Sequence, residues 1–106
     1  MDIQLKKGAL EICVLSILRE KDYYGYELVN ELTKYISVSE ATVYPILKRL
    51  KLNNYLENYL VESKCGPARK YYRITELGVL RLKELTKEWE EFNKNIDMIL
   101  KRGCKE

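Results

Sequence analysis

A short amphipathic helix that runs directly into a basic hairpin, over residues 39–73, constrains the fold of this chain more than any other segment. Drawn as a helix, residues 39–50 (SEATVYPILKRL) have one apolar face, made of Val43, Ile46, Leu47 and Leu50. Residues 55–63 are rich in tyrosine and aliphatic side chains and predict a strand, residues 64–68 (KCGPA) a turn, and residues 69–74 the return strand. The helix needs other elements to cover its apolar face, so we expect the rest of the chain to support this unit.

Two further helices are predicted before this unit. The first ends near Lys21 and has apolar side chains at the spacing of a core-facing helix, namely Leu10, Cys13, Val14, Ile17 and Leu18. The second runs from about Gly25 to Tyr35, with an inward face formed by Leu28, Val29 and Leu32. The short connection at residues 36–38 permits a helix-turn-helix, and the hairpin that follows makes the predicted fold a winged helix.

Single residues predict where these elements begin and bend. Either Ser37 or Ser39 is expected to cap the third helix. Pro45 removes a hydrogen bond within that helix, opposite its buried face, so we expect a bend or a loosened first turn there. Gly25, between tyrosines that are expected to be structural, is predicted to let another backbone come close.

The last predicted helix, capped by Thr75, carries a long apolar seam. Its residues alternate at spacings of three and four, the a/d pattern of a coiled coil, and they are Leu82, Leu85, Trp89, Phe92, Ile96 and Ile99. Part of this seam is expected to cover the first helix, and the rest to form a homodimer interface. The predicted fold class is therefore mostly α with a two-stranded β wing: a winged helix-turn-helix at residues 1–74 and a dimerisation helix at residues 75–106, forming one compact unit.

Positive charge is concentrated on the helix and hairpin. The whole chain has a formal net charge of +3. Residues 38–74 carry seven Lys/Arg against three Asp/Glu, whereas residues 1–37 carry five against six and residues 75–106 carry seven of each. This distribution favours a surface that contacts phosphates over one that only aids solubility.

Several classes of protein are disfavoured by what the sequence lacks. It has no histidine, no phosphate-cradling glycine loop and no nucleophile beside a base, so we expect neither an enzyme nor a bound cofactor. The three cysteines, Cys13, Cys65 and Cys104, are far apart without a CxxC pair, which favours free thiols over a zinc site. No apolar run approaches the roughly 20 residues of a membrane span, and the N-terminal apolar patch lacks a cleavage site. We therefore expect a cytoplasmic protein.

The outer side of the third helix has the shape and chemistry to enter the DNA major groove. Thr42 and Tyr44 carry hydroxyls that can donate to phosphate oxygens. Lys48 and Arg49 supply positive charge one turn further along.

The hairpin offers a second contact with DNA. Lys64, Arg69 and Lys70 surround a tip that Gly66 and Pro67 keep narrow, and such a wing can lie along or in the adjacent minor groove. At the start of the first helix, residues 6–7 (KK) are expected to add a flanking phosphate contact.

Three of these side chains also have structural interpretations. Packing of Tyr44 against the hairpin is an equal alternative to DNA contact. Arg49 has an alternative as an ion-pair partner of Glu57 or Glu62. Arg73, near the base of the hairpin, is expected to form an internal salt bridge and not a DNA contact.

Three strings in one register resemble the PadR family of transcriptional regulators: YYGYEL at 23–28, SEATVYPILKRL at 39–50 and GPARKYYRITELG at 66–78. The resemblance covers nearly the whole chain and implies a winged helix-turn-helix repressor that dimerises through its C-terminal helix. The single C-terminal helix resembles the smaller subgroup of that family. The resemblance also places Thr42, Tyr44 and Lys48 on the recognition helix, and residues 66–70 on the wing.

The resemblance gives Trp89 a further role. In some small relatives, a tryptophan in the middle of this helix meets its symmetry mate and helps to bind flat, often cationic aromatic compounds. Trp89 occupies a comparable place on the seam, which implies a ligand-binding residue. An interface aromatic that only packs for stability is the alternative.

Two hypotheses from different classes follow. The first is a homodimeric, sequence-specific DNA-binding regulator, a repressor, that binds a pseudo-palindromic double-stranded operator and is released by a small planar aromatic effector. The second is a ligand-sensing or adaptor protein whose winged helix mainly contacts other proteins. Neither hypothesis involves a membrane.

Overall fold

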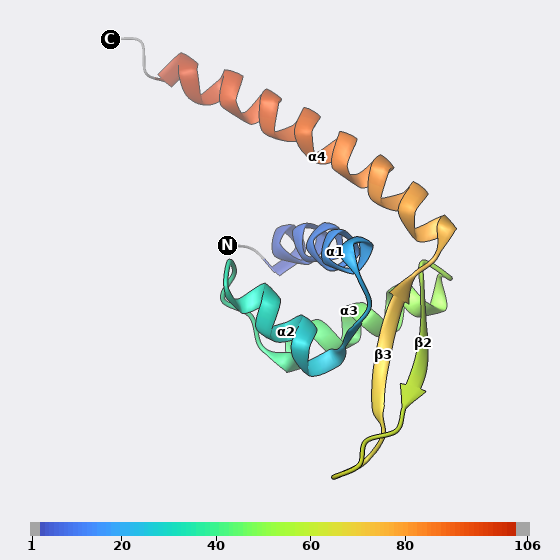
Figure 1. Cartoon of the computed structure of the whole chain (residues 1–106). Helices are drawn as coiled ribbons and strands as arrows, with labels where there is room; N and C mark the ends of the chain where they lie inside the picture. Colours follow the sequence, from blue (N-terminus) through green and yellow to red (C-terminus); the bar gives the residue numbers. More distant parts are fainter. Residues whose placement is uncertain (1–2, 104–106) are drawn as a thin grey trace.

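The computed structural model describes residues 3–103, with side chains from residue 8 onward. In chain order the elements are α1 (Ile3–Glu20), β1 (Tyr23–Tyr24), α2 (Gly25–Thr33), α3 (Glu40–Leu52), β2 (Leu56–Val61), β3 (Arg69–Ile74) and α4 (Glu76–Gly103). The first three helices form the body, the β2–β3 hairpin projects from it, and α4 runs back past α1 and then away from the body (Figure 1). The predicted class, mostly α with a β wing and a long C-terminal helix, is confirmed. The side chains of residues 6–7 and all of Cys104 lie outside the described residues.

The sheet has three strands, where the sequence predicted two. The strand order is β1-β3-β2, with both pairs antiparallel. In the added strand, Tyr23 pairs with Tyr72 and Tyr24 pairs with Tyr71. A two-residue strand is too short to show an alternating pattern, so the sequence offered no periodic signal for it. Through β1, the wing is joined by hydrogen bonds to the start of α2.

The core lies between the three body helices and the inner face of the sheet. The predicted inward faces of α2 and α3 are confirmed, because all seven of their predicted residues are buried. In α1 the buried residues are Leu10, Val14, Leu15 and Leu18, whereas Cys13 and Ile17 are only partly buried. Leu15 was not predicted. It is buried because α1 contacts α2, α3, β3 and α4 and so has a wider buried arc than a single stripe.

Local signals define the ends of the helices. Ser39, and not Ser37, is the N-cap residue of α3. The predicted cap of α4 is confirmed, because the Thr75 hydroxyl accepts a hydrogen bond from the Gly78 N–H at 2.9 Å. The exposed Pro45 lies inside α3, and the helix continues unbroken on both sides of it.

The start of α4 requires glycine. A Cβ atom at Gly78 would collide with the backbone oxygen of Tyr55 and with the side chain of Ile74. Glycine therefore allows α4 to leave the base of the wing at close range and pass over α1. None of the helices among residues 3–103 is long and apolar enough to cross a membrane.

Candidate nucleic-acid interface

Most of the outer surface of α3 is exposed. Thr42, Tyr44 and Lys48 are exposed, while the residues of the opposite face are buried against the body. The buried stripe thus fixes the rotation of α3 about its own axis and determines which residues face solvent.

Tyr44 contacts the start of α2. It is 38% exposed, and a Cβ atom built on Gly25 would lie 2.8 Å from its Cε1 atom and 2.9 Å from its hydroxyl oxygen. Burial raises the pKa of the Tyr44 hydroxyl, and the nearby Glu40 carboxylate raises it further. The group that Gly25 admits is therefore this aromatic side chain, and the predicted close approach of another backbone is wrong.

Arg49 forms an ion pair within the protein. Its Nε donates to Oε1 of Glu11 in α1 at 3.0 Å, and Nη2 contacts the same oxygen. The predicted alternative partners, Glu57 and Glu62, are thus corrected to Glu11. Arg49 lies on the flank of α3 that faces α1, and its guanidinium meets the carboxylate there, 38 residues away in sequence.

The two faces of the wing differ in chemistry. Because side chains alternate along a strand, Arg69, Tyr71 and Arg73 lie on the outer face of β3, while Lys70 and Tyr72 lie on the inner face. Lys70 lines a cavity of about 320 Å³ together with Tyr44 and the start of α2. The two cations Arg69 and Lys70, predicted together, therefore point to opposite sides of the wing.

A row of aromatic rings crosses the outer face of the sheet. Tyr71 lies between Tyr24 and Tyr59, with centroid distances of 5.6 and 5.7 Å. The Arg69 guanidinium lies 4.7 Å from the Tyr24 ring centroid, and that of Arg73 lies 5.2 Å from the Tyr59 ring centroid. These aromatic and cation–π contacts add side-chain attraction to the β1–β3–β2 hydrogen bonds.

Polar contacts hold the base of the wing. The predicted internal salt bridge of Arg73 is confirmed, with its Nε donating to Oε1 of Glu57 at 2.8 Å. The Tyr59 hydroxyl donates to Oδ2 of Asp22 at 2.6 Å, and this hydrogen bond raises the pKa of Tyr59. The wing is therefore attached to the segment before α2 by side chains as well as by β1.

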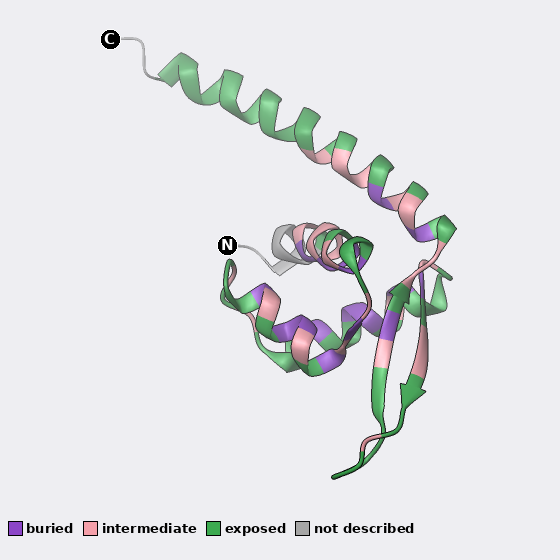
Figure 2. Cartoon of the chain, in the orientation of Figure 1, coloured by how far each residue is buried: buried purple, intermediate pink, exposed green. Residues whose placement is uncertain are grey.

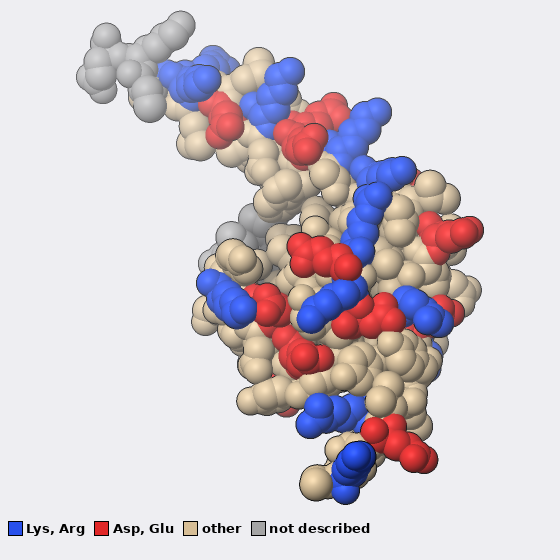
Figure 3. Space-filling view, in the orientation of Figure 1, with Lys and Arg blue, Asp and Glu red and all other residues tan. Residues whose placement is uncertain are grey.

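The tip of the wing is exposed and basic. Lys64, Gly66, Arg69 and Lys70 are all exposed. Gly66 has a φ of 152°, a conformation that L side chains rarely adopt. At the wing end of the molecule, basic side chains stand beside an acidic one, and charges of both signs are spread over the body and α4 (Figure 3).

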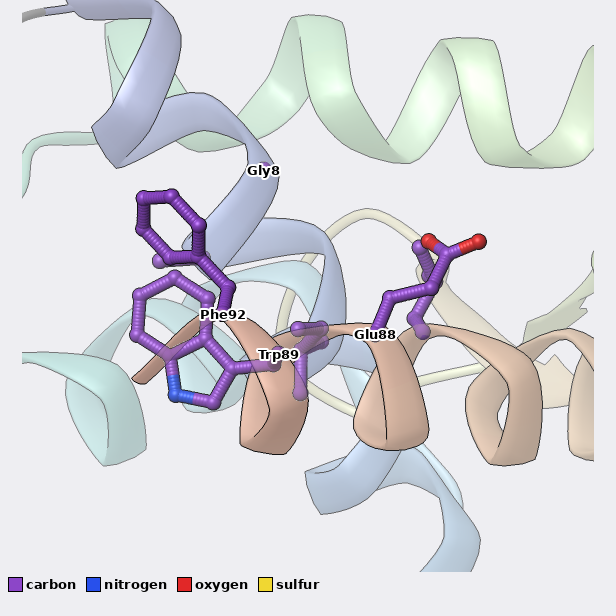
Figure 4. Close-up of a pocket in the computed structure, with 7 residues that line it drawn as sticks. Gly8, Glu88, Trp89 and Phe92 are labelled. Atoms are coloured by element: carbon purple, nitrogen blue, oxygen red, sulfur yellow. The ribbon is translucent and has the colours of Figure 1, made fainter. Parts of the chain in front are cut away.

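Two hollows flank Trp89 where α4 passes α1. A cavity of about 280 Å³ is lined by Gly8, Ala9, Ile12, Leu85, Glu88, Trp89 and Phe92 (Figure 4). A second, of about 590 Å³, shares Trp89 and extends to the connection between α2 and α3. The Trp89 and Phe92 rings are tilted at 42°, with centroids 6.3 Å apart.

Burial of the α4 seam falls along the helix. Leu82 is buried, and Leu85 and Trp89 are partly buried. Phe92, Ile96 and Ile99 are 46%, 39% and 64% exposed, and the distal half of α4 is exposed throughout (Figure 2). The body covers only the first part of the seam.

The geometry can be compared with known proteins. The model of the PadR-like family of transcriptional regulators matches residues 14–84, from α1 into α4. This chain belongs to the PadR-like family. The family is one of transcriptional regulators and not of enzymes, and the chain has its DNA-binding winged-helix fold.

Several individual proteins are similar to this chain. A PadR-like transcriptional regulator from Bacillus cereus is 38% identical, with a TM-score of 0.80 over 92% of this chain and 96% of that one. A protein of Lysinibacillus sphaericus, described as uncharacterized, is 39% identical over 98 residues, or 89% of this chain and 90% of that one. Bacillus subtilis PadR in complex with operator DNA shares the fold at 24% identity, with a TM-score of 0.64 over 71% of this chain and 45% of that one.

Some features of this PadR-like chain were absent from the sequence prediction. The Glu11–Arg49 pair and the Asp22–Tyr59 hydrogen bond join residues 38 and 37 apart in sequence, with no local pattern to connect them. Part of the tyrosine row could have been predicted from the sequence, because Tyr59 and Tyr71 lie in two strands that the hairpin pairs. Its third member needed β1, which was not predicted.

Proposed function

We propose that this PadR-like protein is a homodimeric, sequence-specific DNA-binding repressor. The observation that carries the proposal is the outer surface of α3, exposed over Thr42, Tyr44 and Lys48, beside a basic wing on the same body. A helix presented in this way fits the major groove, while a narrow basic hairpin fits the adjacent minor groove or its phosphates. Such a regulator acts in the cytoplasm, where its DNA lies.

The residues of α3 have distinct proposed roles. Thr42 and Tyr44 donate hydroxyl hydrogens to the DNA backbone, and Lys48 contacts a phosphate or a guanine edge. Arg49 adds charge at the edge of the contact, where its side chain remains 34% exposed while Glu11 holds it.

The wing supplies the second part of the interface. Lys64 and Gly66 form the tip that follows the groove, with Arg69 and Lys70 as phosphate contacts from its two faces. The unit at residues 1–74 is proposed to read DNA, and the helix at residues 75–106 to join two copies.

Dimerisation is proposed through the part of the seam that the body leaves exposed, Phe92, Ile96 and Ile99, with Leu85 and Trp89 at its edge. Leu82, predicted together with them, packs in the core of its own chain. At 28 residues, α4 is about 42 Å long, and its distal apolar side chains are exposed. Each such side chain contributes roughly 1.5 to 3 kcal/mol when it is removed from water. A two-fold dimer would place its two α3 helices in successive major grooves, on a pseudo-palindrome with half-sites about one turn apart.

A small planar aromatic effector is proposed at Trp89. The two hollows that Trp89 lines support this, since both have apolar walls from α1 and α4. An effector stacked there would change how α4 lies on the body and so the spacing of the two α3 helices. Quenching of the only tryptophan by planar aromatic compounds tests this; no quenching across a varied panel leaves Trp89 a packing role alone.

The test of DNA binding uses duplexes selected from a random-sequence pool. Lys48→Ala combined with Arg69→Ala is expected to abolish specific binding while the dimer stays intact in sedimentation. If the double variant binds DNA as the wild type does, the alternative of a ligand-sensing or adaptor protein that contacts other proteins is favoured instead.

A further inference from the structure

The absence of a side chain at Gly25 leaves a slot, and the Tyr44 ring occupies it. Gly25 is buried at the first position of α2, and Tyr44 comes from the outer surface of α3. A Cβ atom on Gly25 would lie 2.8 Å from Cε1, 2.9 Å from the hydroxyl oxygen and 3.3 Å from Cζ of Tyr44. Real Cβ atoms do not approach other atoms this closely, so any side chain at position 25 displaces the tyrosine ring.

Nothing else in the structure requires a glycine at this position. Among the described glycines only Gly66 has a positive φ, so the backbone of Gly25 would accept alanine. The slot for Tyr44 is therefore the physical reason for glycine here.

Tyr44 lies where α2, α3 and the wing meet. The cavity of about 320 Å³ at this point is lined by Tyr24, Gly25, Tyr26, Tyr44, Lys70 and Tyr72. The slot holds the far end of the Tyr44 ring against α2, while α3 carries its backbone and Lys70 of the wing stands across the cavity. Two carboxylates lie nearby: Glu27 accepts the Tyr24 N–H at 3.3 Å, and Glu40 precedes Tyr44 on α3.

We propose that Gly25 is a positioning residue for DNA recognition, because its missing side chain fixes the Tyr44 ring between α2 and the wing. Tyr44 and Lys70 then present a hydroxyl and an ammonium group to the same stretch of DNA backbone. This inference rests on the proposed DNA-binding function and adds to it a residue that does not touch DNA.

The effect of replacing a glycine by alanine depends on which atoms the new Cβ atom would meet. At Gly25 the nearest atoms belong to the end of a side chain, which can rotate away while the fold stays intact. At Gly78 the nearest atom is a backbone oxygen, which cannot. Gly25→Ala is therefore expected to keep the fold and misplace Tyr44, whereas Gly78→Ala is expected to lower the unfolding temperature.

The experiment is a double-mutant cycle on DNA affinity. Dissociation constants are measured for a duplex selected by the wild type, with wild type, Gly25→Ala, Tyr44→Ala and the double variant. Gly25→Ala is expected to weaken binding about tenfold, the loss that a single contact of about 1.4 kcal/mol carries. In the Tyr44→Ala background it is expected to have no further effect, because no ring remains to be displaced.

Gly103→Ala is the neutral control, since a Cβ there has nothing within 4 Å. Unchanged affinity for Gly25→Ala would overturn the proposal, as would an equal loss with and without the Tyr44 ring, which would mean that Gly25 acts through the fold alone. If the wild type prefers no duplex over a scrambled one while Gly25→Ala keeps its unfolding temperature, the proposed function fails and this inference fails with it.

Discussion

Lys48 and Arg49 are neighbouring cations on α3, but they make different contacts. Lys48 is exposed and makes no ion pair within the described part of the chain, whereas Arg49 is held by Glu11 of α1. Both were predicted to bring positive charge to DNA, with an ion pair to Glu57 or Glu62 as the alternative for Arg49. Only the packing of α3 on α1 separates them, and packing between distant segments is not visible in a local pattern.

Arg49→Ala is predicted to lower the free energy of unfolding by about 1.5 kcal/mol, because it removes hydrogen bonds to a charged, partly buried carboxylate. Lys48→Ala is the matched control and should change stability by less than about 0.5 kcal/mol. Urea denaturation of both variants measures this. Equal stability of the two variants would mean that the Glu11 contact contributes nothing in solution.

Tyr72 is predicted to make stability depend on pH in the alkaline range. It is 8% exposed, and burial, followed by its interaction with Tyr44, raises its pKa in the folded state. Because the folded pKa is raised, the stability that the protonated Tyr72 contributes is fully present below the unfolded pKa of about 10. This contribution is lost as pH rises through the folded pKa. Denaturation between about pH 8 and pH 11 should therefore show a steeper loss for the wild type than for Tyr72→Phe. Parallel curves would contradict this.

At the scale of elements, periodic patterns predicted the helices and the hairpin well. The faces of α2 and α3 followed from spacing alone, and the start of α4 followed from Thr75. The start of α3 was left open between Ser37 and Ser39, and the structure has Ser39 at the N-cap position without a side-chain cap hydrogen bond. Strand β1 was not predicted, because two residues are too few to show the alternation of side chains that identifies a strand. Its pairing with β3 is nevertheless what fixes the wing relative to α2.

The wing is predicted to use its two faces unequally. Lys70 faces the cavity beside Tyr44, whereas the Arg69 guanidinium stacks on Tyr24 on the outer face. Lys70→Ala should therefore reduce the slope of log affinity against log salt by about 1, the effect of one lost phosphate contact. Arg69→Ala should reduce it less. Equal slopes for the two variants would show that DNA meets both faces of the wing alike.

The whole molecule is elongated. Its extents are 64 × 27 × 21 Å and its radius of gyration is 16.4 Å, against about 13 Å for a compact domain of 100 residues. The projecting part is the distal half of α4. The seam predicted this arrangement from its length, since the body is too small to cover all of it.

Ile96→Glu is predicted to convert the protein to a monomer, because it places a charge in the exposed half of the seam. Sedimentation at micromolar concentration measures this. Lys94→Ala, on the opposite side of α4, is the control and should leave the dimer intact. A wild-type protein that is already monomeric at that concentration would contradict the dimer proposal.

The central claim is that α3 and the wing bind a specific DNA sequence. The most direct measurement is the affinity of the wild type for a selected duplex and for a scrambled duplex of the same composition, over a range of salt concentrations. We predict tighter binding to the selected duplex at every salt concentration, with affinity that falls steeply and linearly on a log–log plot as phosphate contacts are screened. Equal affinity for both duplexes, or affinity that does not change with salt, would contradict the account.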